Sequence, residues 1–124
     1  DIKQIQVALE LYFDSNGRYP QNIGEVVTAG FLPATPADPL NSGIYTYKYA
    51  TQSATPASNL DYHMAAVLEG VVGTGVLATD SDCSSAAAGC FAGAAAAGGF
   101  LGLSTDCATT AALAAAETCY DVTP

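Results

Sequence analysis

Four cysteines in the last third of the chain offer the clearest covalent chemistry in the sequence: Cys83, Cys90, Cys107 and Cys119. They lie 7, 17 and 12 positions apart without a CxxC motif, and the only histidine is far upstream, so the spacing does not fit a zinc site. An even number favours two disulfides, which form in an oxidising compartment, over free thiols or a redox pair. Of three possible pairings we expect Cys83–Cys90 and Cys107–Cys119, because short loops close at a lower entropic cost.

Asp80 and Asp82 form the most site-like acidic pair. They flank Ser81 in a polar segment, and Asp106 and Asp121 could add oxygen ligands of the kind that calcium prefers. The spacing is not that of an EF-hand loop, and the alternative is an acidic loop that simply faces water. Calcium at Asp80 and Asp82 is the one metal hypothesis that the sequence supports, and no other cofactor is expected.

His63 is the only histidine, and it is expected to lie within a strand. Catalysis by a histidine needs a nucleophile or a carboxylate that the fold places beside it. Asp61 lies two residues away, on the same face of the expected strand, but no serine has a recognisable catalytic setting. We therefore predict a structural histidine and a protein that is not an enzyme.

Basic residues are scarce. The chain has three basic residues, Lys3, Arg18 and Lys48, and twelve acidic ones, which gives a net charge of -9. Beyond Lys48 there are seven acids and no base. This argues against binding nucleic acid or anionic lipid, both of which require clustered Lys and Arg. Half of the residues are apolar, with alanine the commonest of them, and no apolar run approaches about 18 residues. We expect an exported domain with a modest core that disulfides support.

The N-terminal segment Asp1–Phe13 has the apolar periodicity of an amphipathic helix. Its apolar stripe consists of Ile2, Ile5, Leu9 and Tyr12. Val7 and Leu11 lie off this stripe. The turn-forming residues 14–17 should end the helix, with Gly17 in the left-handed cap position. Because the periodicity is already running at the second residue, we expect this segment to be the remainder of a longer helix.

The middle of the chain predicts a second short helix and two strands. Gln21–Ala29 should be helical, and three prolines in residues 33–39 predict a stiff, extended loop. The alternation in Tyr45–Tyr49 predicts a strand with its three tyrosines on one face, and Tyr62–Leu68 predicts its antiparallel partner. We expect both strands to pack on the apolar stripe of the first helix.

The C-terminal region is rich in alanine and glycine, which make up 19 of the 37 residues from Cys83 to Cys119. Residues 108–117 favour a helix, residues 94–99 could be helix or loop, and residues 120–122 could form a final edge strand. The expected fold is α+β in a single domain, 1–124. Its parts are the helix (1–14), a helix–sheet loop (15–43), the sheet (44–78) and a disulfide-tied C-terminal region (79–124).

This order of motifs resembles the globular part of type IV pilins and of the major pseudopilins of type II secretion. The family pattern is an amphipathic helix, AL..Y..D.G.YP, a loop ending P.DP, and antiparallel strands. Tyr62–Glu69 and the ending Cys119–Pro124 are also similar to segments of those proteins. The matching positions are Ala8, Leu9, Tyr12, Asp14, Gly17, Tyr19, Pro20, Pro36, Asp38 and Pro39.

The resemblance implies a subunit that polymerises through its N-terminal helix into an extracellular pilus. The family's helix begins with an apolar half that lies in the inner membrane before assembly and later forms the filament core. We therefore expect about 20 or more apolar residues and a basic leader ending in Gly to precede this chain. Implied partners are other pilin subunits and the inner-membrane assembly machinery, with no nucleic acid and membrane contact only through that apolar half.

Two alternatives remain for the function, a periplasmic pseudopilin of a type II secretion system and a minor pilin that acts as an adhesive or binding module. In either case the helix should form the assembly surface, and the Ala/Gly-rich region should be a secondary contact. The helix residues assigned to assembly are Ile2, Ile5, Val7, Leu9, Leu11 and Tyr12.

Overall fold

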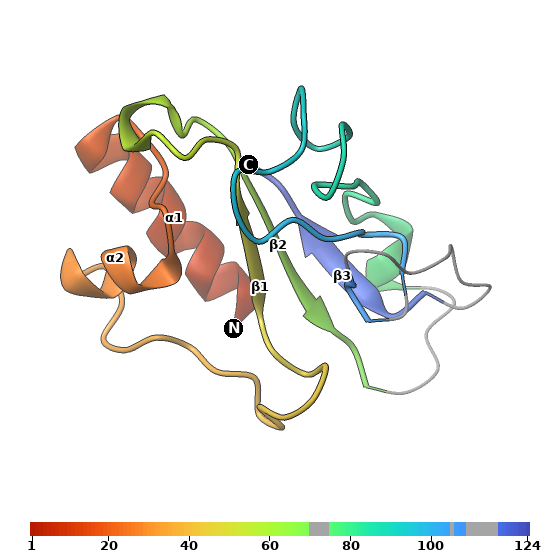
Figure 1. The fold of residues 1–124 in the computed structure, drawn as a ribbon. Coiled ribbons are helices and arrows are strands. Elements are labelled where there is room, and N and C mark those ends of the chain that lie inside the picture. The colour runs from red at the N-terminus through yellow and green to blue at the C-terminus, as the bar shows by residue number, and fades with distance from the viewer. Residues whose placement is uncertain (70–74, 105, 109–116) are drawn as a thin grey trace.

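The chain folds as an α+β domain in which one long helix packs on a three-stranded antiparallel sheet (Figure 1). The structure is a computed structural model, and it describes residues 1–69, 75–104, 106–108 and 117–124. The helices α1 and α2 lie on one side of the sheet, and the irregular C-terminal segments lie on the other. No helix within these ranges is long and apolar enough to cross a membrane.

Helix α1 (Ile2–Asn16) buries the apolar stripe that its periodicity predicts. Ile5, Leu9 and Tyr12 are at most 4% exposed, and Ala8 is buried between them. The prediction that residues 14–16 form a turn is wrong, because the helix continues to Asn16, whose side chain donates to the Tyr12 carbonyl. Gly17 ends the helix at φ 68°, and its N–H bonds the Phe13 carbonyl at 2.7 Å.

The sheet has the strand order β1-β2-β3, with β1 at Lys48–Thr51, β2 at Tyr62–Val67 and β3 at Cys119–Val122. Both neighbouring pairs are antiparallel. All six residues of β2 are buried, so this central strand contacts protein on both of its faces. β3 corresponds to the edge strand predicted at residues 120–122, and it begins one residue earlier, at Cys119.

The first predicted strand is displaced along the chain. Tyr45 donates its N–H to Ser42 and Thr46 donates to Ile44, so turn hydrogen bonds occupy the backbone where the tyrosine alternation begins. The strand therefore starts only at Lys48. As a result the three tyrosines do not share one environment. Tyr47 and Tyr49 pack against the helix side of the sheet, whereas Tyr45 packs against the opposite side.

Two hydrophobic clusters lie on opposite faces of the sheet. The first joins α1 and Val26 of α2 (Ile23–Thr28) to Tyr62, Met64 and Ala66 of β2. The second joins Ala65 and Val67 of the same strand to residues of the Ala/Gly-rich region, chiefly Phe91, Phe100, Cys107 and Cys119. The sequence predicted the first cluster only. The second cluster is formed by widely spaced aromatic residues that show no periodicity.

Irregular segments cover the outer edges of the sheet. Thr51 of β1 forms a bridge with Ala97, and Ser81 donates to the Asp121 carbonyl of β3. Residues 94–99, for which helix and loop were both possible, form no helix. The expected helix at residues 108–117 lies largely outside the described part of the chain. Backbone hydrogen bonds with the sheet therefore order a region that has few bulky side chains.

Candidate functional site

The residues assigned to assembly divide into two groups on α1. Ile2, Ile5, Leu9 and Tyr12 are buried in the chain's own core, so they do not form an outward surface for a neighbouring subunit. Val7 is 60% exposed and Leu11 is 46% exposed. These two side chains are the part of the apolar set that α1 presents outward.

Val7 and Leu11 line a groove of about 460 Å³ beside the helix. Its opposite wall is the start of the proline-rich loop, Phe31, Leu32 and Pro33. Phe31 also packs edge-on against the Tyr12 ring, with 6.2 Å between ring centroids, which ties this wall to the helix. The groove is thus an apolar surface between two elements that the core holds in place.

Both expected disulfides are present. Cys83 is bonded to Cys90 and Cys107 to Cys119, with Cα–Cα distances of 5.2 Å in each case. Cys107 and Cys119 are buried in the second cluster and link β3 to the segment before it. The prediction that short-range pairs form is confirmed.

His63 lies at the centre of a buried network that resembles a hydrolase triad in composition. Its Nδ1 lies 2.7 Å from Ser85 Oγ and its Nε2 lies 2.7 Å from Asp121 Oδ2. The ring stacks on Phe100 at 3.9 Å between centroids. The side chains of His63, Ser85 and Asp121 are all 0% exposed, so the serine hydroxyl has no contact with solvent. The arrangement joins β2, β3 and the C-terminal region, and the chain itself covers its three polar side chains.

Sequence reasoning missed both partners of this histidine. Asp61, the neighbour that the sequence suggested, bonds its own strand at the Tyr62 N–H instead. Ser85 lies 22 residues from His63 and Asp121 lies 58, so no local pattern connects them. Gly102 lies so close to the Asp121 carboxylate that a side chain there would collide with it, but only the folded structure reveals this constraint.

The predicted acidic pair lies beside this network. One carboxylate oxygen each from Asp80, Asp82 and Asp121 lies within 4.8 Å of the others. Asp121 accepts the Asp82 N–H at 3.0 Å, and Asp80 accepts the Asp121 N–H at 3.3 Å. Glu117, which the sequence did not suggest, interacts with Asp80 and Asp82 and joins the group. We call Asp80, Asp82, Glu117 and Asp121 the carboxylate cluster. Asp106 is not part of it and lines a separate hollow with Lys48.

Burial and repulsion from neighbouring acids make two members of the carboxylate cluster, Asp80 and Glu117, hard to ionise. Burial is the largest cause that raises the pKa of Asp80 to about 6, and the charges of Asp121 and Asp82 add to it. Burial also raises the pKa of Glu117 to about 7, with repulsion from Asp82 and Asp80 as the next causes. Asp80 Oδ1 and Glu117 Oε1 are buried and have no hydrogen-bond partner among the described residues. Unpaired carboxylate oxygens beside several acids suit a hard cation such as calcium.

Comparisons with known proteins gave no match to any family model, curated protein or solved structure. Two features of the geometry therefore remain for a functional argument. They are the outward apolar face of α1 and the carboxylate cluster behind β3.

Proposed function

We propose that this chain is a structural subunit of a type IV pilus-like extracellular filament and that it polymerises through its N-terminal helix. The observation that supports the proposal is the division of α1 into a buried stripe and an outward apolar face. Val7 at 60% exposure and Leu11 at 46% are large apolar side chains on a helix whose own domain does not cover them. Their burial between subunits would stabilise a filament by roughly 25 cal/mol for each Å² removed from water.

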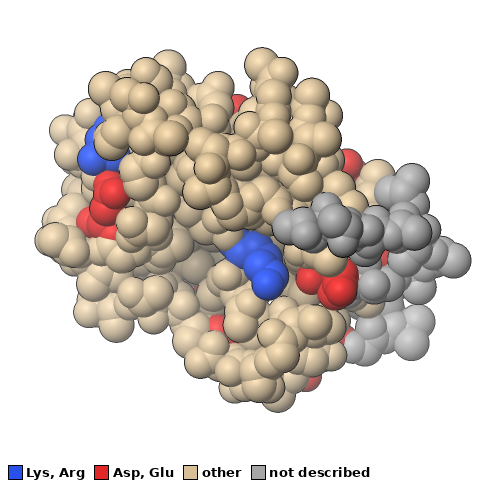
Figure 2. Space-filling view, viewed as in Figure 1, with Lys and Arg blue, Asp and Glu red and all other residues tan. Residues whose placement is uncertain are grey.

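The sparse charge of the molecule's surface is compatible with assembly. In the view of Figure 2 charged side chains are few and most of the surface is uncharged. Interface cores are typically depleted of charge. The triad-like group around His63 is fully buried. The protein as proposed is not an enzyme.

The proposal includes the partners and locations that the resemblance implies. Other pilin subunits would contact the helix, and the assembly machinery of the inner membrane would insert each subunit. An apolar helical segment preceding α1 would hold the subunit in the inner membrane, with the domain in the periplasm, until it enters the filament. The coding sequence upstream of Asp1 tests this part, since charged or loop-forming residues there would contradict it.

A pseudopilin of a type II secretion system is the second candidate, and the carboxylate cluster is the observation that favours it. This cluster gathers four acids from the last part of the chain, although the Ala/Gly-rich region around it departs from the acidic C-terminal region that is common in pseudopilins. Immunogold labelling distinguishes the candidates, because a pilus subunit labels filaments outside the cell and a pseudopilin labels the periplasm. A minor, adhesive pilin would instead show a low copy number along the filament.

Val7→Glu tests the assembly face in the full-length protein. A charge on this exposed side chain should change the free energy of unfolding by no more than about 0.5 kcal/mol, because it replaces no buried contact. In a filament the same charge would be removed from water within an apolar contact, which should strongly reduce filaments seen by electron microscopy.

Val76→Glu is the matched control. Val76 is 55% exposed, close to the value for Val7, but it lies in the short 3-10 helix Val76–Ala78 and not on α1. This variant should keep both its circular dichroism spectrum and its filaments. The assembly face is misassigned if Val7→Glu unfolds the domain, or if filaments form as before.

A further inference from the structure

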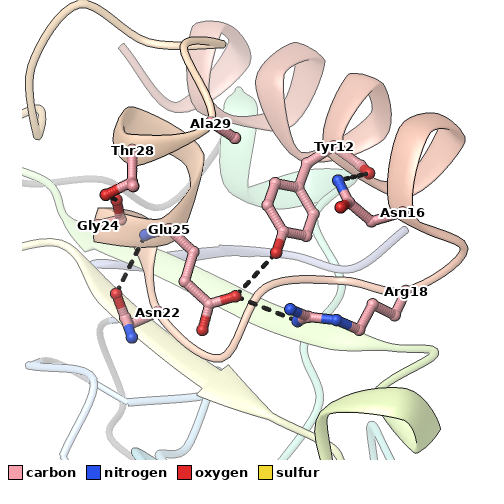
Figure 3. Close-up of a pocket in the computed structure, with 8 residues that line it drawn as sticks. All are labelled: Tyr12, Asn16, Arg18, Asn22, Gly24, Glu25, Thr28 and Ala29. Atoms are coloured by element: carbon pink, nitrogen blue, oxygen red, sulfur yellow. Dashed lines mark hydrogen bonds and ion pairs between the residues drawn. The ribbon is translucent and has the colours of Figure 1, made fainter.

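A polar hollow of about 590 Å³ lies between the end of α1 and helix α2 (Figure 3), and it shares no lining residue with the apolar groove or the carboxylate cluster. Glu25 of α2 stands at its centre. Arg18, from the turn after α1, and Tyr12, from α1 itself, both point at this carboxylate. Tyr12 donates to Glu25 Oε2 at 2.9 Å, and Arg18 Nη1 lies 3.1 Å from the same atom. Three separate segments therefore fix the charged pair in the hollow.

The hydrogen bonds within the hollow leave part of each polar group unused. The Tyr12 and Arg18 bonds to Glu25 both end on Oε2, and Oε1 accepts no hydrogen bond from the described residues. Asn22 uses its oxygen to cap α2, and Asn16 uses its nitrogen on the Tyr12 carbonyl. The Asn22 amide nitrogen and the Asn16 amide oxygen thus form no hydrogen bond with the described residues. The walls offer free donors and free acceptors in the same space.

The balance of charge and hydrogen bonding restricts the ligand class. Arg18 and Glu25 neutralise each other, and their side chains are 23% and 30% exposed. An anion would meet Glu25 in a molecule of net charge -9, and a cation would meet Arg18. A hydroxyl group both donates and accepts, so it suits neighbouring donors and acceptors without adding charge. We propose that this hollow binds a neutral, polyhydroxylated ligand with the chemistry of an uncharged pyranose sugar.

The hollow binds the sugar by hydrogen bonding and not by stacking. The guanidinium of Arg18 lies over the Tyr12 ring at 5.4 Å, and Phe31 packs on the same tyrosine. Because these neighbours already contact the aromatic side chain, it does not offer a sugar an open platform. Binding through exposed hydrogen bonds alone predicts a dissociation constant of about 1–10 mM.

The test is a titration of the ¹⁵N-labelled protein with methyl β-D-glucopyranoside, followed by amide NMR. Saturable shifts are expected at residues 16, 18, 22 and 25. A second titration with cellobiose shows whether the natural ligand is a glycan chain or a single sugar unit. Tighter binding of cellobiose assigns the site to a glycan chain, and equal binding assigns it to a single sugar unit.

Two variants and a control separate binding from folding. Glu25→Gln should raise the dissociation constant at least about tenfold. Asn22→Asp keeps the oxygen that caps α2 but removes the free donor, and it should weaken binding even if Glu25→Gln unfolds. Glu10→Gln is the control. Glu10 of α1 accepts the Tyr19 hydroxyl, as Glu25 accepts the Tyr12 hydroxyl, but it lies outside the hollow.

Sugar binding in this hollow does not depend on filament assembly, so it can be refuted without refuting the proposed function. The absence of saturable shifts up to 100 mM sugar would overturn it, as would equal binding by both variants and the wild type. Tighter binding of glucuronate or glycine than of the glucoside would also overturn it, because the charge-balance argument would then be wrong.

Discussion

Ser85 shows how one buried hydroxyl can stabilise the side of the sheet that lacks regular structure. Its Oγ lies 2.7 Å from His63 Nδ1 and accepts the Phe100 N–H at 3.1 Å. It therefore connects β2 to two separate parts of the Ala/Gly-rich region. The network around His63 has the residue types of a catalytic triad, yet its full burial gives it a structural role. Composition alone does not distinguish the two roles, and exposure does.

Replacing Ser85 with alanine should destabilise the domain by about 1–3 kcal/mol, because it leaves a buried donor at Phe100 and a histidine nitrogen without a partner. Chemical denaturation in urea measures the change. The adjacent Ser84→Ala is the matched control, since Ser84 accepts only an exposed bond from Ala87 at 3.3 Å and should cost less than about 0.5 kcal/mol. Equal losses in the two variants would remove the structural role assigned to the network.

The carboxylate cluster predicts an unusual dependence of stability on pH. Asp80 and Glu117 have raised folded-state pKa values of about 6 and about 7, above the unfolded values near 4. Between these limits the folded state binds more protons than the unfolded state, so the free energy of unfolding should increase as pH falls from about 8 to 5. Asp80→Asn should flatten this increase while keeping an oxygen for the Asp121 N–H. The measurement is urea denaturation at several pH values with a metal chelator present.

Asp14→Asn is the control for this pH profile, because Asp14 is exposed at the end of α1 and has no part in the cluster. Its profile should match that of the wild type. If stability falls steadily as pH decreases from 8 to 5, the raised pKa values of Asp80 and Glu117 are wrong.

Calcium should counteract the repulsion within the carboxylate cluster. A cation that binds only the folded state raises stability by RT ln(1 + [Ca²⁺]/Kd), which is about 2.7 kcal/mol at one hundred times Kd. Calcium should therefore raise the melting temperature at pH 8, and less at pH 5, where protons compete for the same oxygens. Asp80→Asn should lose this effect, and magnesium should produce less of it because it demands stricter geometry. A melting temperature at pH 8 that calcium leaves unchanged would refute the metal site.

At the level of elements, sequence reasoning succeeded where one local rule determined the structure. The spacing of Ile2, Ile5 and Leu9 predicted the buried face of α1, and Gly17 predicted its end. Short loops predicted both disulfides. Each of these features depends on residues that are close together in the chain.

Elements that depend on distant contacts were predicted less well. The tyrosine alternation from Tyr45 is typical of a strand. Hydrogen bonds to the Ser42 and Ile44 carbonyls form a turn there instead, and the strand begins only at Lys48. The second hydrophobic cluster was missed because Phe91 and Phe100 stand among alanines and glycines without periodicity. The candidate metal site was predicted only in part for the same reason. Asp80 and Asp82 are neighbours in sequence, but β3 and the segment before it bring Asp121 and Glu117 to them.

At the level of the whole molecule, the net charge of -9 opposes the proposed assembly. Each subunit would meet neighbours that carry twelve acids and three bases. Buried apolar surface has to exceed this repulsion, and salt should help by screening it, since the Debye length falls from about 30 Å at 0.01 M to about 3 Å at 1 M ionic strength. A basic residue placed at the contact would therefore have a large effect.

Lys3 is the one basic residue that lines the apolar groove beside Val7 and Leu11. It is exposed, and among the described residues its side chain bonds Gln6 alone, at 3.0 Å, so its charge is available to an acidic neighbour. Lys3→Glu should therefore reduce filament assembly at about 0.01 M salt, and about 1 M salt should restore it because screening removes the new repulsion. Lys48→Glu is the control, since Lys48 lines a separate hollow with Asp106, beside the Ala/Gly-rich region expected to be only a secondary contact, and should reduce assembly much less than Lys3→Glu. Sedimentation and electron microscopy of the full-length variants measure both effects. If Lys3→Glu and Lys48→Glu behave alike, or if salt fails to rescue Lys3→Glu, the groove beside α1 is not where subunits meet.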